Sequence, residues 1–288
     1  MFDPRDPYER YYWHYDAKWP LSIAQIIANQ SVDPTTVALI WFLLDYGASL
    51  IVAGPTDPQP GVGKTTTINA LLQFLPDDTT LVYTCGMYEN FSFLAAPGLD
   101  PATTCILSNE ISDHSPIYMW GHVAQRYLKL PRHDYRIITS VHADTIDDVL
   151  RMFTYDLRLS AEDVRHLGII INIGLMGGTY QRRWATTHFF HPSSKLRHPH
   201  EAVALQLSSF QEEQQEFHHA DQSVIDELAY QTGMTVEAFT ATLEQRKYCL
   251  IEAAKNGGAD MQRMAKIIRE MRTALRQSHE APSFSNPI

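Results

Sequence analysis

The chain has 288 residues, three cysteines and a formal net charge of -10 at pH 7. A hydrophobic share of 44 % and a charged share of 19 % are typical of a soluble globular protein. The acidic balance argues against a generic nucleic-acid binder, and the odd, scattered cysteines argue against a disulfide framework. No stretch approaches the roughly 20 apolar residues of a membrane span, and the first residues lack the order of a signal peptide. We therefore expect a cytoplasmic protein and no specific nucleic acid partner.

Aromatic residues crowd the first 20 positions. We expect residues 1–32 to form a short arm that packs on the main domain or on a neighbouring subunit, with a base-stacking platform as the alternative. Within the arm, Ser22 and Gln25 form a capping-box pattern that predicts a short helix. Asp33-Pro34 is a second helix start, and the helix that it opens is expected to end before Gly47.

Apolar runs that alternate with helical segments predict a mostly parallel sheet covered on both faces. The expected strands are 50–53, 80–84, 104–108, 136–141, 168–173 and 183–190. We expect residues 33–200 to form this α/β domain. Apolar residues at three- and four-residue spacing then predict helices at 224–230, 236–254 and 261–275. Residues 201–288 are accordingly expected to form an all-helical appendage.

A glycine-rich turn separates the first expected strand from the helix that follows it. The turn is Gly61-Val62-Gly63-Lys64-Thr65-Thr66. In such a turn the backbone N–H groups converge on phosphate oxygens, the lysine reaches the terminal phosphates and a hydroxyl binds Mg²⁺. The pattern therefore predicts a nucleoside triphosphate site, with a chance Gly-Lys-Thr in a surface turn as the alternative.

The phosphate loop is irregular. Pro58 stands where the first glycine is usual, and the nearest earlier glycine is Gly54. Pro58 and Pro60 have no N–H to offer. The amide donors must therefore come from residues 61–66.

Two further strands end in residues suited to phosphate chemistry. Glu110 follows the expected strand 104–108, where a carboxylate in a phosphate-loop enzyme holds the Mg²⁺ shell or orients the attacking water. His142 follows the strand 136–141, at the carboxyl edge where ligands bind in open α/β sheets. The alternatives are an exposed glutamate at a strand end and a structural histidine.

Two weaker patterns suggest other chemistry. Zinc could use the spacing of a late histidine cluster, although no cysteine lies near it. The cluster is His188, His191, His198 and His200. A small-molecule kinase would need a basic lid, for which the candidates are Arg126, Arg132 and Arg136, but their spacing matches no recognised lid.

In their order along the chain, these segments resemble the ATPases of the type II/type IV secretion and type IV pilus superfamily, a family of RecA-like motors. The resemblance covers about residues 20–190, and the opening and the helical tail are similar to the archaeal-type branch. It rests on four segments: the phosphate loop with four inserted residues, 109–113 as the second motif, 139–145 as the histidine box, and Gln181-Arg182-Arg183.

The resemblance implies a RecA-like P-loop domain in an ATP-binding and ATP-hydrolysing motor subunit that uses ATP and Mg²⁺. It assigns Lys64 to the β- and γ-phosphates and Thr65 to Mg²⁺. It assigns Glu110 to the Mg²⁺ shell or the catalytic water, and His142 to sensing the γ-phosphate.

The same resemblance implies an assembly. It predicts a homo-oligomer in the form of a hexameric ring, with Arg182 and Arg183 meeting phosphate from within the subunit or across an interface. An inner-membrane platform protein is the expected partner. Membrane contact is expected only through partners, at the inner face of the membrane.

The chain departs from the family pattern in three places. The insertion 57–60 lengthens the phosphate loop, and the family's separate N-terminal domain is reduced to a short arm. Cys85-Gly86 replaces the acidic pair after the second strand, and Glu89 remains as a candidate base at an unusual spacing. Because a missing general base lowers a rate by about 10²–10⁴-fold, Glu110 would act alone or hydrolysis would be slow. A catalytically weak, nucleotide-binding structural or regulatory component is therefore the second hypothesis.

Overall fold

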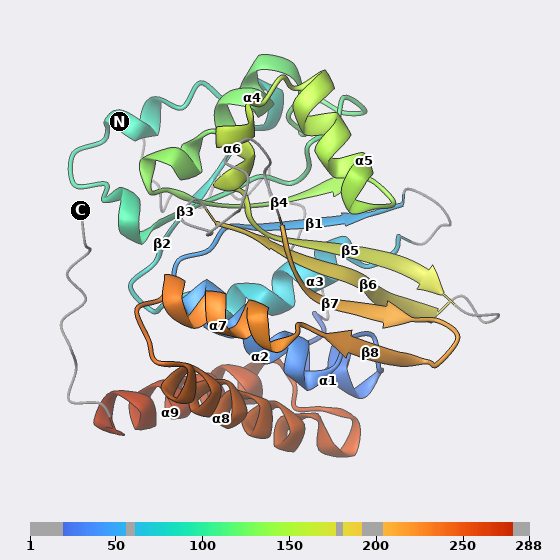
Figure 1. Cartoon of the computed structure of the whole chain (residues 1–288). Helices are drawn as coiled ribbons and strands as arrows, with labels where there is room; N and C mark the ends of the chain where they lie inside the picture. Colours follow the sequence, from blue (N-terminus) through green and yellow to red (C-terminus); the bar gives the residue numbers. More distant parts are fainter. Residues whose placement is uncertain (1–19, 56–60, 177–180, 192–203, 279–288) are drawn as a thin grey trace.

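The computed structural model describes residues 20–55, 61–176, 181–191 and 204–278. In these residues, one eight-stranded sheet has the order β2-β3-β4-β1-β5-β6-β7-β8 (Figure 1). The pairs from β2 to β5 are parallel, and β6, β7 and β8 continue the sheet in antiparallel fashion. The expected α/β fold with a mostly parallel sheet and C-terminal helices is confirmed.

The strands agree closely with the apolar runs of the sequence. They are β1 (Leu50–Gly54), β2 (Thr80–Tyr83), β3 (Thr104–Leu107), β4 (Arg136–His142), β5 (Gly168–Met176), β6 (Gln181–Phe190), β7 (Leu205–Gln211) and β8 (Glu216–His219). Leu50 of β1 pairs with Ile138 of β4 on one side and with Ile169 of β5 on the other. These central strands are largely buried because helices cover both faces of the sheet.

The expectation that residues 201–288 are all helical is wrong, because β7 and β8 extend the sheet to His219. The apolar signal of β7 is weak, since Ser208 and Ser209 interrupt the alternation of the strand. The pairing of β6 with β7 also shifts register at His188, so that a simple two-residue period is lost. The helical part begins at Gln222.

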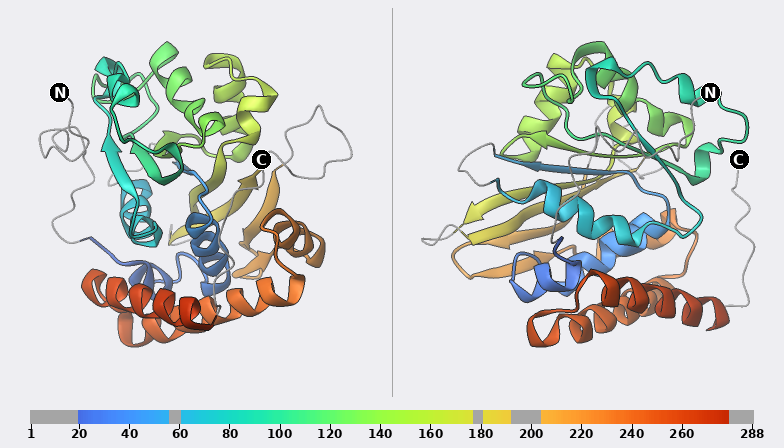
Figure 2. Two further views of the ribbon diagram at one scale, coloured as in Figure 1. Left: turned by 90° about the vertical axis from the view of Figure 1, so that its left-hand side faces the viewer. Right: turned by 180° about the vertical axis from the view of Figure 1, so that it is seen from behind.

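Two layers of helices enclose the sheet (Figures 1 and 2). One face carries α4 (Gly121–Leu128), α5 (Ile146–Arg151) and α6 (Ala161–Arg165). The other face carries α1 (Ile23–Ala28), α2 (Pro34–Asp45), α3 (Lys64–Leu71), α7 (Gln222–Gln231), α8 (Val236–Ala254) and α9 (Met261–Ser278). Shorter turns are η2 (Leu72–Phe74), η3 (Gly86–Tyr88), η4 (Ser92–Ala95), η5 (Pro101–Thr103), η6 (Leu130–His133), η7 (Met152–Asp156) and η8 (Lys255–Gly257).

Local signals start the first helices as expected. Ser22 and Gln25 form the capping box of α1, and Asp33 caps α2 by accepting from the N–H groups of Thr35 and Thr36. The described part of the arm is therefore an integral element: Ile23 is fully buried, and α1 packs on α8. Residues 1–19 of the expected arm lie outside the described residues.

The C-terminal helices are held to the core by apolar packing and by one ion cluster. Asp45, at the end of α2, accepts from Arg246 of α8 at 2.9 Å and from Arg272 of α9 at 2.6 Å. Arg246 also lies over the rings of Trp41 and Phe42. In the described part of the chain, we find no helix with both the length and the apolar character of a membrane span.

Candidate nucleotide-binding site

The phosphate loop lies between the carboxyl end of β1 and the start of α3. Gly63 caps the helix with φ of 108°, a left-handed conformation that favours glycine. A Cβ on Gly54 would lie 2.8 Å from Cγ1 of Val62, so a glycine is needed where the returning loop packs on the strand end. The inserted segment, with Pro58 and Pro60, lies outside the described residues.

The first turn of α3 offers the groups that a phosphate requires. The N–H groups of the first helical turn have no intrahelical acceptor, and the helix dipole favours an anion at this end. The side chain of Thr65 is exposed and that of Thr66 is half-buried, whereas Lys64 is turned inward and is buried. This end of α3 can therefore receive an anionic ligand.

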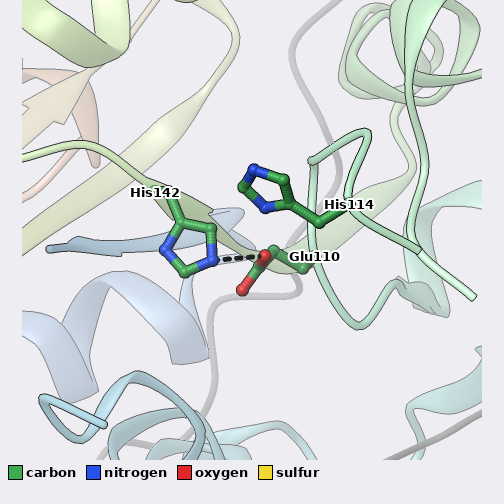
Figure 3. A group of neighbouring side chains, drawn as sticks. All are labelled: Glu110, His114 and His142. Atoms are coloured by element: carbon green, nitrogen blue, oxygen red, sulfur yellow. Dashed lines mark ion pairs between the residues drawn. The ribbon is translucent and has the colours of Figure 1, made fainter. Parts of the chain in front are cut away.

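Lys64, Glu110 and His142 converge beside the loop, from the start of α3, the loop after β3 and the end of β4. The Nζ of Lys64 lies 2.8 Å from Nδ1 of His142 and 3.9 Å from Oε2 of Glu110. It also lies 3.4 Å from the carbonyl oxygen of Gly54. Nε2 of His142 lies 2.7 Å from Oε1 of Glu110 (Figure 3). The strand order explains the convergence, because β1, β4 and β3 are neighbours in the sheet.

The contacts of His142 define its tautomer. An ammonium group can only donate, so Nδ1 of His142 accepts from Lys64. With Nδ1 as the acceptor, the proton of a neutral ring is on Nε2, which lies 2.7 Å from Oε1 of Glu110. The three side chains form one polar cluster, in which Lys64 lies close to both His142 and Glu110.

Lys64 is a cation in an environment that disfavours its charge. Burial lowers the pKa of Lys64, and the carboxylate of Glu110 opposes this effect only in part. A further anion beside the ammonium group would stabilise its charged form. The electrostatics of the site thus favour an anionic ligand.

The two arginines of the Gln181-Arg182-Arg183 segment have different surroundings. Nη2 of Arg182 donates to the carbonyl oxygen of Gly61 at 3.3 Å, so this exposed side chain lies over the phosphate loop. Arg183 is buried, and its guanidinium lies 5.3 Å from the ring centroid of Phe210 in β7. The structure therefore brings Arg182, and not Arg183, to the phosphate loop.

Glu89 is engaged within its own loop. Its carboxylate accepts from the backbone N–H groups of Cys85 and Phe91. Gly86 has φ of +61°, and a Cβ there would lie 2.5 Å from backbone atoms of Ile117. Glu89 thus stabilises the loop after β2.

The three arginines considered for a kinase lid are Arg126, Arg132 and Arg136, and each occupies a different place in the fold. Arg126 lies over the ring of Phe91, and Arg132 pairs with Asp163 at 3.0 Å. Arg136 begins β4, at the end of the strand opposite to His142. These positions do not form a lid over the phosphate loop.

The histidine cluster is described only in part. His188 is buried in β6, and the ring of His191 lies 5.8 Å from that of Phe189. Burial lowers the pKa of both histidines. His198 and His200 lie outside the described residues.

His114 is a site residue that the sequence pattern did not indicate. Its loop folds back from β3, and its ring lies 5.6 Å from that of His142 (Figure 3). His142 also lines a cleft of about 340 Å³, together with the charged side chains of Asp144, Asp148, Arg151 and Asp156. The only sequence signal for His114 is its place four residues after Glu110.

The comparisons with known proteins are limited. No protein-family model matches the chain. The uncharacterized protein MJ0900 of Methanocaldococcus jannaschii is 33 % identical over 66 residues, which are 23 % of this chain and 11 % of that protein. The chain therefore spans about a tenth of the length of this relative.

Among solved structures, the chain is similar to the VirB11 ATPase from the Brucella suis type IV secretion system, in complex with sulphate. The two share 18 % identity over 53 % of this chain and 51 % of that chain, with a TM-score of 0.39.

Proposed function

We propose that this chain binds a nucleoside triphosphate together with Mg²⁺ and hydrolyses the terminal phosphate. The convergence of Lys64, Glu110 and His142 at the start of α3 carries the proposal. A buried ammonium group, a set of helix-terminal N–H groups and a buried carboxylate are the parts that a phosphoryl-transfer site requires.

Each residue has a role that its position supports. Lys64 would exchange its internal partners for the β- and γ-phosphates, and Arg182 would approach them from above the loop. The hydroxyl of Thr65 and the carboxylate of Glu110 are hard oxygen donors, which fit Mg²⁺. Bound Mg²⁺ would neutralise the charge that develops on the phosphates. Glu110 would also orient the attacking water, and His142 would hold the carboxylate in place through Nε2.

A substitution at Lys64 tests the proposal. Lys64→Ala should reduce steady-state phosphate release from Mg²⁺-ATP by about 10²-fold or more, because a preorganised charge that stabilises the transition state is removed. Lys266→Ala is the matched control, since Lys266 is exposed on α9 and pairs with Glu270 of its own helix. If purified native protein released no phosphate from Mg²⁺-ATP, the proposed hydrolysis would be refuted.

A catalytically weak nucleotide-binding component is the second candidate. It is favoured by Cys85-Gly86 in place of an acidic pair, and by the engagement of Glu89 with two backbone N–H groups. It predicts nucleotide binding with negligible turnover. A native rate near 1 s⁻¹, which lies at the low end of typical enzymes, would exclude it.

At the level of assembly, we propose a cytoplasmic motor subunit of a secretion or type IV pilus-like machine. The order of the four sequence segments and the exposed Arg182 beside the loop support a ring of identical subunits. An inner-membrane platform protein would be its partner. The mass of the chain in solution, measured with and without Mg²⁺-ATP, tests the ring directly.

A further inference from the structure

We propose that Glu110, His114 and His142 form a binding site for a borderline-soft divalent metal ion, with Zn²⁺ as the preferred ion. One ligand atom from each residue lies within 4.8 Å of the other two (Figure 3). Two imidazoles and one carboxylate are a set that suits zinc, whereas Mg²⁺ prefers oxygen donors alone. This site shares Glu110 with the Thr65 and Glu110 pair proposed for Mg²⁺, and differs from it by its two imidazole ligands.

The donors need only a small adjustment to reach one ion. Nitrogen and oxygen ligands at about 2.0–2.2 Å from zinc lie roughly 3.3 Å apart in a tetrahedron. Glu110 and His142 already approach to 2.7 Å. The side chain of His114 is 62 % exposed, so its ring can turn toward the other two without disturbing the core.

The backbone holds all three residues in place. The N–H of Ile111 donates to the carbonyl oxygen of Ser140, which ties the start of the loop to β4. The N–H of Met119 donates to the carbonyl oxygen of Glu110, so the loop that carries His114 closes on itself. The site is therefore built at the end of the sheet, with His142 on β4 and the other two ligands on the loop after β3.

Two of the three ligands also have a partner that orients them. Oγ of Ser112 lies 2.8 Å from Nδ1 of His114, and Oγ of Ser140 lies 3.4 Å from Oε2 of Glu110. Asp113 adds a negative charge 3.8 Å from Nε2 of His114. Such outer partners are typical of metal sites, where they set the orientation of each ligand.

The positive charge of Lys64 opposes the binding of a metal ion at this site. Its ammonium group lies 2.8 Å from His142 and must move away when the metal ion binds. The side chain has a flexible four-carbon stem, and phosphates bound at the loop would draw it off. Removal of the lysine should therefore leave metal binding intact or make it tighter, while it abolishes nucleotide binding.

The experiment titrates the full-length chain with Co²⁺, and then with Zn²⁺ as competitor, in the absence of nucleotide. We expect one equivalent of Co²⁺ to give the visible absorption bands of a tetrahedral site, and Zn²⁺ to displace it. His114→Ala should weaken the affinity by about 10²-fold or more, at least the upper range seen for loss of an outer partner. His122→Ala is the matched control, because His122 is exposed on α4. Glu110→Gln, with native circular dichroism, is a second variant that should also weaken binding.

The outcomes separate this proposal from the nucleotide site. Lys64→Ala should bind Co²⁺ at least as tightly as the native chain, although it loses ATP. Absence of a saturable Co²⁺ spectrum, or equal affinities of the native chain and His114→Ala, would overturn the metal site. Retention of ATP binding in that case would leave the proposed function standing.

Discussion

The ion cluster at Asp45 gives a stability prediction whose size follows from the structure. Asp45 accepts hydrogen bonds from two arginines of the C-terminal helices, and their side chains are only 6 % and 10 % exposed. Burial lowers the pKa of Arg246, and the charge of Asp45 opposes that effect. Asp45→Asn keeps the shape of the side chain and removes the charge that compensates both arginines.

Breaking a buried ion pair by removing one partner lowers the free energy of unfolding by about 3–5 kcal/mol. Asp45 is 20 % exposed, and Arg272 retains the carbonyl oxygen of Phe74 at 2.7 Å. We therefore expect a loss near the lower limit, about 3 kcal/mol, with most of it from Arg246.

Urea unfolding followed by circular dichroism measures the loss. Asp77→Asn is the matched control: Asp77 pairs with Arg272 at 3.3 Å, and its side chain is 60 % exposed. An exposed pair contributes about 0–1 kcal/mol. If Asp45→Asn lost no more stability than Asp77→Asn, the cluster would not hold the C-terminal helices, and the reasoning would be refuted.

Two further predictions concern acid stability and turnover. Burial raises the pKa of Asp163, but hydrogen bonds from Ser160 and Arg132 outweigh it, so that the pKa lies below its usual value of 3.8. This carboxylate stabilises the fold above about pH 4, and its contribution is lost as the pH falls through the lower, folded value. Asp163→Asn should flatten the decline in unfolding free energy below about pH 4, and a profile parallel to that of the native chain would contradict the assignment. In the phosphate-release assay, Cys85→Glu should raise a slow native rate by about 10²-fold if a missing base limits it, with Gly86 left unchanged because it has no room for a Cβ. An unchanged rate of phosphate release in Cys85→Glu would show that the missing carboxylate does not limit turnover.

The strands were predictable where both faces of the sheet are covered. β1, β4 and β5 are central and buried, so each carries a short apolar run that can be read from neighbouring residues alone. β7 escaped prediction because Ser208 and Ser209 interrupt its apolar pattern. Its place in the sheet depends on pairing with β6, which a local pattern does not contain.

The candidate site was predictable one residue at a time. Lys64 was indicated by its glycine loop, and Glu110 and His142 were indicated by the ends of apolar strands. Their mutual distances depend on the strand order, which places β4 between β1 and β3. The different surroundings of Arg182 and Arg183 also needed the fold, because adjacent residues of a strand point to opposite faces.

The sequence by itself determined the strand, loop and helix that make the phosphate site, the caps that start α1 and α2, and the helical C-terminal segments. These features depend on interactions between residues a few positions apart, which leave a mark in the order of the residues. Only the tertiary structure decided that His114 meets Glu110 and His142, and that Asp45 meets arginines 201 and 227 positions away. Such contacts arise when the chain closes on itself, and no local pattern records which distant partner each side chain will find.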